Sequence, residues 1–153
     1  MSLGLGFTPR RPRRCPAWNY WSDGAYFVTF VTARRRRCLS DIVRREVRLT
    51  PAGEGVLVAL LDMPSHHSGV SLGEFVIMPD HVHLLLHLLR PSAPLPTIVN
   101  HLKARATREV RLIASPSSGR LWQPSFNDHI IRDPRHLRTV ERYIRTNPRR
   151  WRG

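Results

Sequence analysis

The segment from Val70 to Leu89 constrains the fold more than any other part of the chain. Two largely apolar runs meet there at Pro79-Asp80, a dipeptide typical of tight turns. The sequence therefore predicts a β-hairpin with strands over residues 70–78 and 81–89. Because side chains alternate along a strand, the second strand presents one continuous apolar face, made of Val82, Leu84, Leu86 and Leu88.

Further elements are predicted on both sides of this hairpin. An aromatic and β-branched run predicts a strand over residues 25–32, and a last strand is predicted over 128–132. Thr50-Pro51 and Asp133-Pro134 each place an N-cap residue before proline, and predict helices over 51–63, ending before Pro64, and over 134–147. Another helix is predicted from Pro96 to about residue 114. The order predicts an α+β, ferredoxin-like antiparallel sheet (βαββαβ) with an additional C-terminal helix that carries Tyr143.

The chain has 153 residues, a length typical of one domain. Residues 1–24 are rich in Arg and Pro and predict a basic N-terminal arm, followed by a single domain over 25–153. Lys and Arg number 25 against 11 Asp and Glu, which gives a formal net charge of +14. Such an excess of positive charge favours a polyanionic partner, and nucleic acid is the usual one.

Membrane and disulfide-rich classes are excluded by the same sequence. No apolar run approaches the roughly 18 residues of a membrane span, and no signal peptide is visible. Two cysteines, Cys15 and Cys38, are too few for a disulfide scaffold or a thiolate zinc site. We therefore expect a cytoplasmic protein with reduced thiols and no membrane partner.

A histidine pair lies at the start of the second hairpin strand. His81 and His83 share one face, with Cα atoms about 7 Å apart, so both imidazoles can converge on one ion. His87 lies further along that face. Two ligands rarely suffice for a metal, so a purely hydrogen-bonded pair is the alternative.

The last predicted helix places two polar groups beside its buried stripe. Leu137, Val140 and Ile144 have the spacing of a buried face, and Tyr143 and Asn147 are one turn apart on an adjacent face. Tyr143 can also be an aromatic at the edge of the core, and Asn147 a helix C-cap before Pro148.

Several basic and aromatic residues are candidates for contacts with DNA. An arginine run follows the first strand as a solvated loop or a phosphate clamp, and comprises Arg34, Arg35, Arg36 and Arg37. Residues 10–14 and the helical residues Arg105, Arg108 and Arg111 can line a path for a nucleic-acid backbone. Four tryptophans, Trp18, Trp21, Trp122 and Trp151, can stack on bases, with core packing the alternative for at least two of them.

Four sequence segments together resemble one family. MPDHVHLLL, residues 78–86, resembles the HUH motif (His, bulky apolar, His) of the single-tyrosine transposases. YFVTFVTARRRRCL (26–39), LWQPSFNDHIIRD (121–133) and RYIRTNP (142–148) are similar to that family's first strand and basic loop, its segment before the catalytic helix, and its tyrosine helix end. The chain most resembles the REP-associated tyrosine transposases, relatives of the transposases of the smallest insertion sequences, over about residues 17–151.

The resemblance implies a single-stranded DNA endonuclease and strand transferase that works through a 5′-phosphotyrosine intermediate. It implies that Tyr143 is the nucleophile, and that His81 and His83, with Asn147 one turn after the tyrosine, bind a divalent metal, Mg²⁺ or Mn²⁺. It also implies single-stranded DNA with a hairpin as substrate, and a monomer or homodimer. Trp122 and His129 match recurrent positions of the family. Relatives often carry a C-terminal tail that contributes to DNA binding, whereas this sequence stops at Gly153, which bears on autonomous activity and target choice.

Two alternatives to a transposase stay open at this point. One is a ferredoxin-like module that binds nucleic acid without cutting it. The other is a metal-dependent nuclease in which water attacks the phosphate. Only the transposase requires the hydroxyl of Tyr143 for cleavage, so replacing this tyrosine by phenylalanine separates the three.

Overall fold

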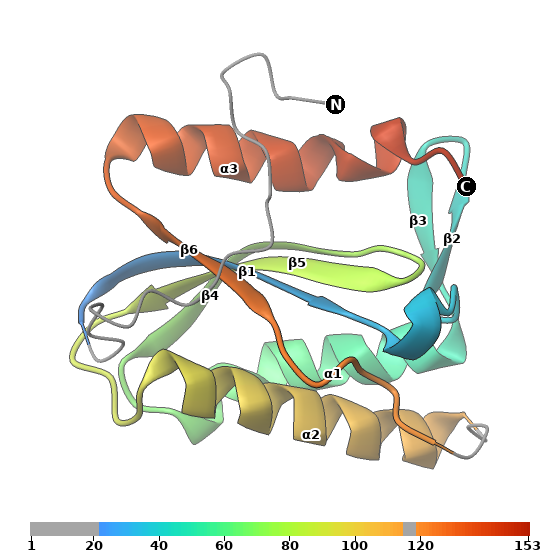
Figure 1. Cartoon of the computed structure of the whole chain (residues 1–153), viewed down its shortest axis with the longest axis horizontal. Coiled ribbons are helices and arrows are strands. Elements are labelled where there is room, and N and C mark those ends of the chain that lie inside the picture. The colour runs from blue at the N-terminus through green and yellow to red at the C-terminus, as the bar shows by residue number, and fades with distance from the viewer. Residues whose placement is uncertain (1–21, 115–118) are drawn as a thin grey trace.

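The computed structural model describes residues 22–114 and 119–153 (Figure 1). Its centre is a four-stranded antiparallel sheet in the order β4-β5-β1-β6. The strands are β1 (Gly24–Val31), β4 (Val70–Ile77), β5 (His81–Leu88) and β6 (Asn127–Ile131). Most of the predicted N-terminal arm, with residues 10–14, Cys15, Trp18 and Trp21, lies outside the described residues.

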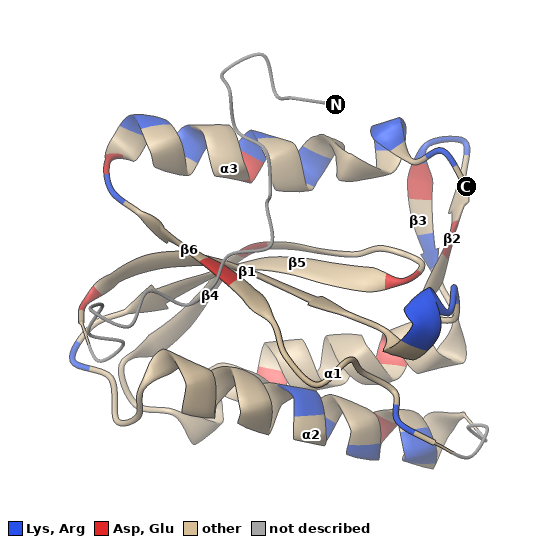
Figure 2. Cartoon of the chain, viewed as in Figure 1, with Lys and Arg blue, Asp and Glu red and all other residues tan. Residues whose placement is uncertain are grey.

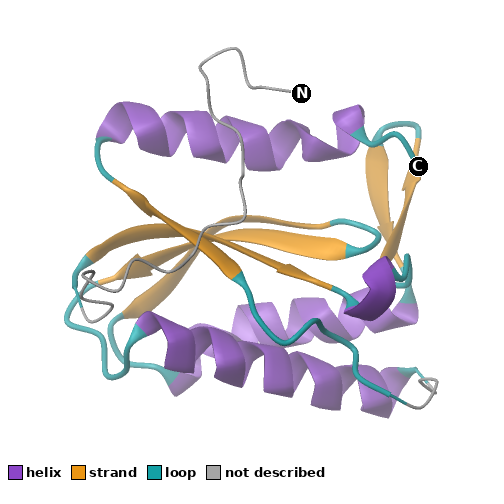
Figure 3. Ribbon diagram, in the orientation of Figure 1, coloured by secondary structure: helices purple, strands orange, loops and turns teal. Residues whose placement is uncertain are grey.

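Three helices cover the two faces of this sheet. Helices α1 (Pro51–His66) and α2 (Leu95–Ile113) lie on one face, and α3 (Pro134–Thr146) lies on the other (Figures 1 and 3). Strand, helix, hairpin, helix and strand follow one another as βαββαβ, with α3 added at the end. The predicted ferredoxin-like α+β architecture is confirmed.

Strand alternation gives the sheet two different cores. The larger core, toward α1 and α2, contains Tyr26, Val28 and Phe30 of β1 and the even-numbered apolar residues of β5. The smaller core, toward α3, contains Phe27, Leu85, Val140 and Ile144, all nearly or fully buried. His81 and His83 alternate with the residues of the larger core, so they belong to the face that α3 covers.

A small hairpin beside the main sheet was not expected from the sequence. It consists of β2 (Ser40–Val43) and β3 (Glu46–Leu49), paired antiparallel with Ile42 opposite Val47. Its turn is made by Arg44 and Arg45, with φ of 52° and 66°. Glycine or asparagine usually marks such a left-handed turn, and neither stands there, so local turn rules miss it.

Helix α1 continues past Pro64 to His66, so the predicted end before this proline is wrong. Proline lacks one backbone donor, and in the last turn of a helix that loss affects a single hydrogen bond. The last turn is stabilised by its own side chains. Ser65 Oγ donates to the Asp62 carbonyl at 2.7 Å, and the His66 ring hydrogen-bonds the Asp62 carboxylate at 2.7 Å.

A close approach of the two lower helices explains a glycine in α1. A Cβ atom added to Gly55 would lie 2.8 Å from the backbone nitrogen of Val110 in α2. Glycine normally weakens a helix interior, so it is retained here because no larger residue fits. Within the described part of the chain, none of the helices is long and apolar enough to cross a membrane.

Candidate active site

The two histidines of β5 lie side by side beneath α3. Their ring centroids are 4.6 Å apart, at an interplanar angle of 69°. His83 is almost fully buried, whereas 15% of the His81 side chain is exposed. Because the more exposed ring borders the more buried one, a ligand that reaches His81 from solvent can also reach His83.

Each histidine ring is held by a hydrogen bond at Nδ1. His81 Nδ1 lies 2.6 Å from Asp80 Oδ1, and His83 Nδ1 lies 2.7 Å from Thr29 Oγ1. Thr29 stands opposite His83 in the β1–β5 register, so sheet pairing itself sets the second contact. With Nδ1 engaged, Nε2 is the ring nitrogen that can bind a metal, which is the usual arrangement of histidine ligands.

The protonation state of His83 suits a ligand. Burial lowers the pKa of His83 well below its ordinary value, and the charges of His81 and Arg150 lower it further. His83 is therefore neutral at neutral pH, as metal binding requires.

Asp80 supports His81 as an ionised carboxylate. Burial alone would raise the pKa of Asp80, but the hydrogen bond and charge of His81, together with Arg35, outweigh burial and lower it. Arg35 Nη1 lies 3.4 Å from Asp80 Oδ2. The result is a chain from Arg35 through Asp80 to His81, in which the carboxylate orients the imidazole.

Helix α3 brings Tyr143 to the same place. Val140 and Ile144 pack into the smaller core, so the adjacent side chain of Tyr143 points toward the sheet. Its ring centroid lies 5.4 Å from that of His83 and 5.9 Å from that of Phe27. This helix therefore packs on the histidine side of the sheet.

Asn147 has two contacts at the end of α3. It is the C-cap, and its backbone N–H donates to the carbonyl of Ile144. Its side chain also hydrogen-bonds the Tyr143 hydroxyl. Burial raises the pKa of Tyr143, and the hydrogen bond from Asn147 and the charge of Arg150 oppose that rise.

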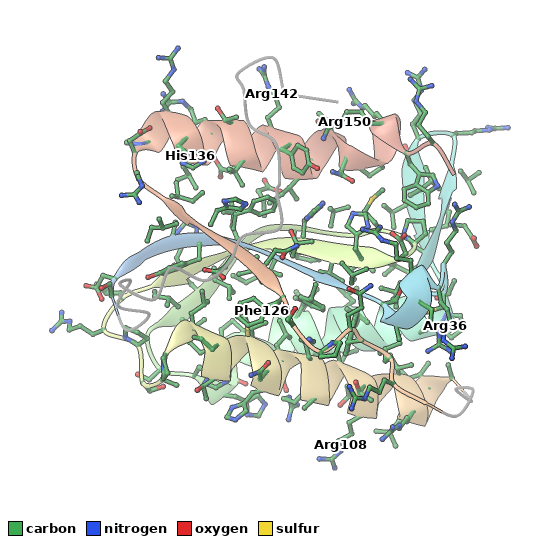
Figure 4. All side chains as sticks on the ribbon, viewed as in Figure 1. Arg36, Arg108, Phe126, His136, Arg142 and Arg150 are labelled. Atoms are coloured by element: carbon green, nitrogen blue, oxygen red, sulfur yellow. The ribbon has the colours of Figure 1, made fainter. Side chains whose placement is uncertain are left out.

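Sequence reasoning missed Arg150. This residue belongs to η2 (Asn147–Arg150), the 3-10 turn that follows α3 (Figure 4). Its guanidinium carbon lies 4.5 Å from the centroid of the Tyr143 ring, and its Nη2 donates to the Tyr143 carbonyl at 2.8 Å. Seven residues separate the two along the chain, and only the turn after Pro148 folds one onto the other.

A pocket of about 340 Å³ opens at this end of α3. Trp151 forms one wall, with its ring 6.4 Å from His81 and the guanidinium of Arg37 5.4 Å above it. Tyr143 therefore borders a basic, partly aromatic hollow, which is lined by Tyr143, Asn147, Arg149, Arg150, Trp151 and Arg152.

The arginine run after β1 is divided between two sites. It begins in η1 (Ala33–Arg35), where Arg34 and Arg35 have φ of 55° and 51°. Arg35 and Arg37 contact Asp80 and Trp151 at the histidine end of the sheet. Arg36 instead donates to the carbonyl of Arg120 at 2.8 Å, and Arg34 is exposed.

Arg105 and Arg108 lie on α2, across the sheet from Tyr143. Arg105 forms an ion pair with Asp62 of α1, whereas Arg108 is exposed and points away from the sheet (Figure 4). Neither can contact a phosphate held between the histidines and Tyr143. A contact of these residues with another part of the DNA stays a prediction.

Trp122 is a core residue, which agrees with the core-packing alternative given for the tryptophans. It is 6% exposed, its ring packs edge-on against Phe30 at 4.7 Å, and its Nε1 donates to the carbonyl of Lys103 at 3.1 Å. His129 packs on the other face of β1, with its ring 6.3 Å from Phe27. His136 begins α3, where its backbone N–H donates to the Asp133 cap at 2.8 Å.

The donor set around the histidine pair is limited. In the parts of the chain that the structure describes, no group of three His, Cys, Asp or Glu residues is placed to hold a metal ion. A third protein ligand beside His81 and His83 would therefore have to be a residue other than His, Cys, Asp or Glu. The amide of Asn147 is a candidate, because it hydrogen-bonds Tyr143, whose ring lies 5.4 Å from that of His83.

Two solved structures are similar to this chain in fold. A REP-associated tyrosine transposase bound to a REP hairpin superposes with a TM-score of 0.66 at 20% identity, over 88% of this chain and 72% of that one. A putative transposase from Deinococcus radiodurans gives a TM-score of 0.54 at 24% identity, over 88% of this chain and 96% of that one.

Sequence comparison finds relatives of this chain and a matching protein family. An uncharacterized protein of Haemophilus influenzae is 27% identical over 168 residues, covering 95% of this chain and 92% of that protein. The ISDra2 transposase TnpA of Deinococcus radiodurans is 32% identical over 89 residues, covering 54% and 61%. Residues 21–147 match the family of IS200-like transposases. Since that match spans most of the chain, from β1 to the end of α3, the chain belongs to the IS200-like transposase family.

Proposed function

We propose that this transposase cleaves and rejoins single-stranded DNA through a covalent bond between Tyr143 and a 5′ phosphate. The observation that carries the proposal is the contact between the Tyr143 and His83 rings, 5.4 Å apart, with His81 4.6 Å further along. A tyrosine from a helix and two histidines from a strand meet there across a sheet face, beside a basic pocket.

The reaction needs two displacements at phosphorus. In the first, the deprotonated Oη of Tyr143 attacks the scissile phosphodiester, the bond from phosphorus to the 3′ oxygen breaks, and the leaving oxygen takes up a proton. The products are a 5′-phosphotyrosine and a free 3′-hydroxyl. In the second, a 3′-hydroxyl attacks the phosphotyrosine and Tyr143 regains its proton. The ester energy is kept in the covalent intermediate, so rejoining requires no ATP.

The residues present fit a divalent cation, Mg²⁺ or Mn²⁺. His81 and His83 would bind it through Nε2, because both Nδ1 atoms are engaged. Asn147 can hydrogen-bond Tyr143 through its NH₂ group and offer its amide oxygen to the cation, since an amide carries both functions. When bound, the cation would polarise the scissile phosphate and favour its in-line orientation.

The chain's own residues would position the nucleophile and the substrate. Asn147 and Arg150 both favour the ionised form of Tyr143, against the effect of burial. Arg35 and Arg37 lie where backbone phosphates would enter, and Trp151 offers a ring on which a base can stack. We also propose the REP-associated branch and a substrate with a hairpin, because the structural relative with that description is bound to one.

The test is trapping of the covalent intermediate. Labelled single-stranded DNA from the flanks of the gene is incubated with the protein and Mn²⁺, and then separated by denaturing electrophoresis. The wild type should yield a protein–DNA species that leaves a Tyr143 peptide on a DNA 5′ end after proteolysis. Tyr143→Phe should abolish this species without weakening DNA binding. Tyr26→Phe is the matched control, since the Tyr26 hydroxyl donates to the Ser22 carbonyl at 3.1 Å and its ring lies in the larger core, on the face of the sheet opposite the histidines.

Two outcomes would overturn the proposal. Cleavage by Tyr143→Phe at the wild-type rate would mean that water attacks the phosphate and that the protein is a metal-dependent nuclease. Tight binding of DNA by the wild type with neither cleavage nor adduct would mean that it is a nucleic-acid-binding module.

A further inference from the structure

The outer face of α3 carries a row of arginines that the proposed chemistry does not use. They are spaced alternately three and four residues apart, which keeps them on one side of a helix. All are exposed, and Arg142 points away from the sheet (Figure 4). At 1.5 Å per residue the row is about 21 Å long. We call it the α3 arginine row, and its members are Arg135, Arg138, Arg142 and Arg145 of α3 and Arg149 of the following turn, η2.

This row is poorly compensated within the protein. Among the described residues, the one ion pair found for the row joins Arg145 to Glu74 at 3.3 Å. Like charges one turn apart destabilise a helix, and the row contains four such neighbouring pairs. Figure 2 shows positive charge repeated along α3, and the acidic residue of this helix is Glu141. A cost of this kind is offset when a polyanion binds along the helix.

The side chains of the row border an open hollow on the surface. A second hollow, of about 370 Å³, lies along α3. Its lining includes four arginines of the row, together with Thr139 and Glu141. One turn beyond Arg145, Arg149 lines the pocket of Tyr143. The basic surface therefore runs along the helix and ends where the nucleophile is accessible.

From this arrangement we infer that the α3 arginine row binds consecutive backbone phosphates of the DNA whose scissile phosphate lies at Tyr143. The inference rests on the proposed function and extends it by naming the surface that holds the flanking DNA. Arginine guanidinium groups bind phosphate oxygens in a bidentate manner, and such contacts set the register of DNA without reading its sequence. Each strand of a duplex carries one phosphate per about 3.4 Å of helix axis, so a row about 21 Å long can contact several of them.

An acidic membrane surface is the other polyanion that a basic helix can bind, and the packing of α3 argues against it. Interfacial helices insert an apolar face into the lipid. Val140 and Ile144, the fully buried apolar residues of α3, face the smaller core. The side that remains for a ligand is the arginine row itself.

The test compares two triple variants that each remove three positive charges. Arg135, Arg138 and Arg142 are changed to Gln in the first. Arg48, Arg90 and Arg120, which are exposed and lie outside α3, are changed to Gln in the second. DNA affinity is measured without metal from 50 to 200 mM salt, after melting curves confirm that both variants are folded. Loss of three single-strand contacts should make the negative slope of log K against log salt shallower by about 2.

The expected result is specific to the α3 variant. Over this salt range wild-type affinity should fall about 20-fold more than that of the α3 variant, from the change in slope. The second Gln variant should behave as the wild type, and so should a third variant with Arg135, Arg138 and Arg142 changed to Lys, which keeps the charge. Equal slopes for the two Gln variants would overturn the inference, because they would show that only total charge matters.

Two substrates identify which DNA lies on the row. One is a single-stranded oligonucleotide that contains the cleavage site, and the other adds a hairpin stem. If the α3 variant has a shallower salt dependence than the wild type with both substrates, the row binds the single strand. If it does so only with the second substrate, the row binds the stem. Wild-type slopes for the α3 variant on both substrates would contradict the inference. These measurements need no cleavage. A failure to trap the Tyr143 adduct would therefore overturn the proposed function without affecting the measured salt dependence of DNA binding.

Discussion

The guanidinium of Arg150 lies over the ring of Tyr143, 4.5 Å from its centroid, and donates a hydrogen bond to the carbonyl of the same residue. A cation in this position attracts the face of the aromatic ring and favours a negative charge on its oxygen. The proposed nucleophile is therefore covered by a positive charge that comes from the turn after its own helix.

Replacing Arg150 by Gln should slow cleavage and move its pH dependence. Burial raises the pKa of Tyr143 and Arg150 opposes the rise, so loss of Arg150 raises this pKa further. Less phenolate is then present at a given pH, and the pH at which the rate increases shifts upward. We expect about a ten- to hundredfold loss of rate at neutral pH, as for one charge-assisted contact. Single-turnover cleavage measured against pH checks this, with exposed Arg90→Gln as control. An unchanged profile would exclude a role of Arg150 in activating Tyr143.

The histidine pair should be required for metal binding and not for DNA binding. Changing His81 or His83 to Ala should remove Mn²⁺ binding in calorimetry and abolish cleavage, while most DNA affinity remains because the arginines are untouched. His87→Ala, on the same strand face but further along, is the matched control. Unchanged Mn²⁺ affinity in both variants would show that the pair only stabilises the fold through Asp80 and Thr29.

Asn147 should contribute less to metal binding than either histidine. An amide oxygen is a weaker ligand than imidazole for Mn²⁺, so Asn147→Ala should reduce the affinity without removing it. The backbone cap of Asn147 persists in this variant, since the N–H that donates to Ile144 remains. Full cleavage by Asn147→Ala, with only a lower melting temperature, would mean that the side chain is structural.

Asp80 should make stability depend on pH in the acid range. Its pKa lies below the ordinary value of 3.8, so the ionised carboxylate stabilises the fold at pH values above that value. This contribution is lost as the pH falls through the lower pKa of the folded state. Asp80→Asn should therefore be less stable than the wild type at pH 7, and the difference should shrink at pH 3 in urea unfolding. Exposed Asp41→Asn serves as control. A difference independent of pH would contradict the assignment of an ionised Asp80.

Trp122 should affect stability and not DNA affinity. Trp122→Ala removes a buried indole and should cost about 3–5 kcal/mol of unfolding free energy. Trp151→Ala should cost less stability, because this ring is partly exposed, and should weaken single-strand binding by about 1–3 kcal/mol if a base stacks there. Chemical denaturation and DNA titration of both variants check the contrast. A Trp122→Ala protein that keeps its stability but binds DNA more weakly would contradict the assignment of Trp122 to the core.

Some features of the site have a sequence signal and others have none. Asp80 directly precedes His81, so a carboxylate partner for that ring was visible in the sequence. Thr29 is 54 residues from His83, and only the β1–β5 register brings them together. The arginines likewise include some with a sequence signal and some without one. Those at regular helical spacing in α3 were visible as a row, whereas nothing local separates Arg35, which contacts Asp80, from Arg36, which contacts the carbonyl of Arg120.

By itself the sequence determined what the periods of strands and helices control. Alternation places His81 and His83 on one face of a strand, and a four-residue spacing places Tyr143 and Asn147 on one side of a helix. Those local rules show which side chains share a face of a strand or helix, but not which other element that face packs against. Packing decided that α3 covers the histidine side of the sheet, and that Trp122 and Arg105 lie across it. Burial of Val140 and Ile144 against Phe27 and Leu85 selects that face, because all four apolar side chains leave water only when α3 lies there.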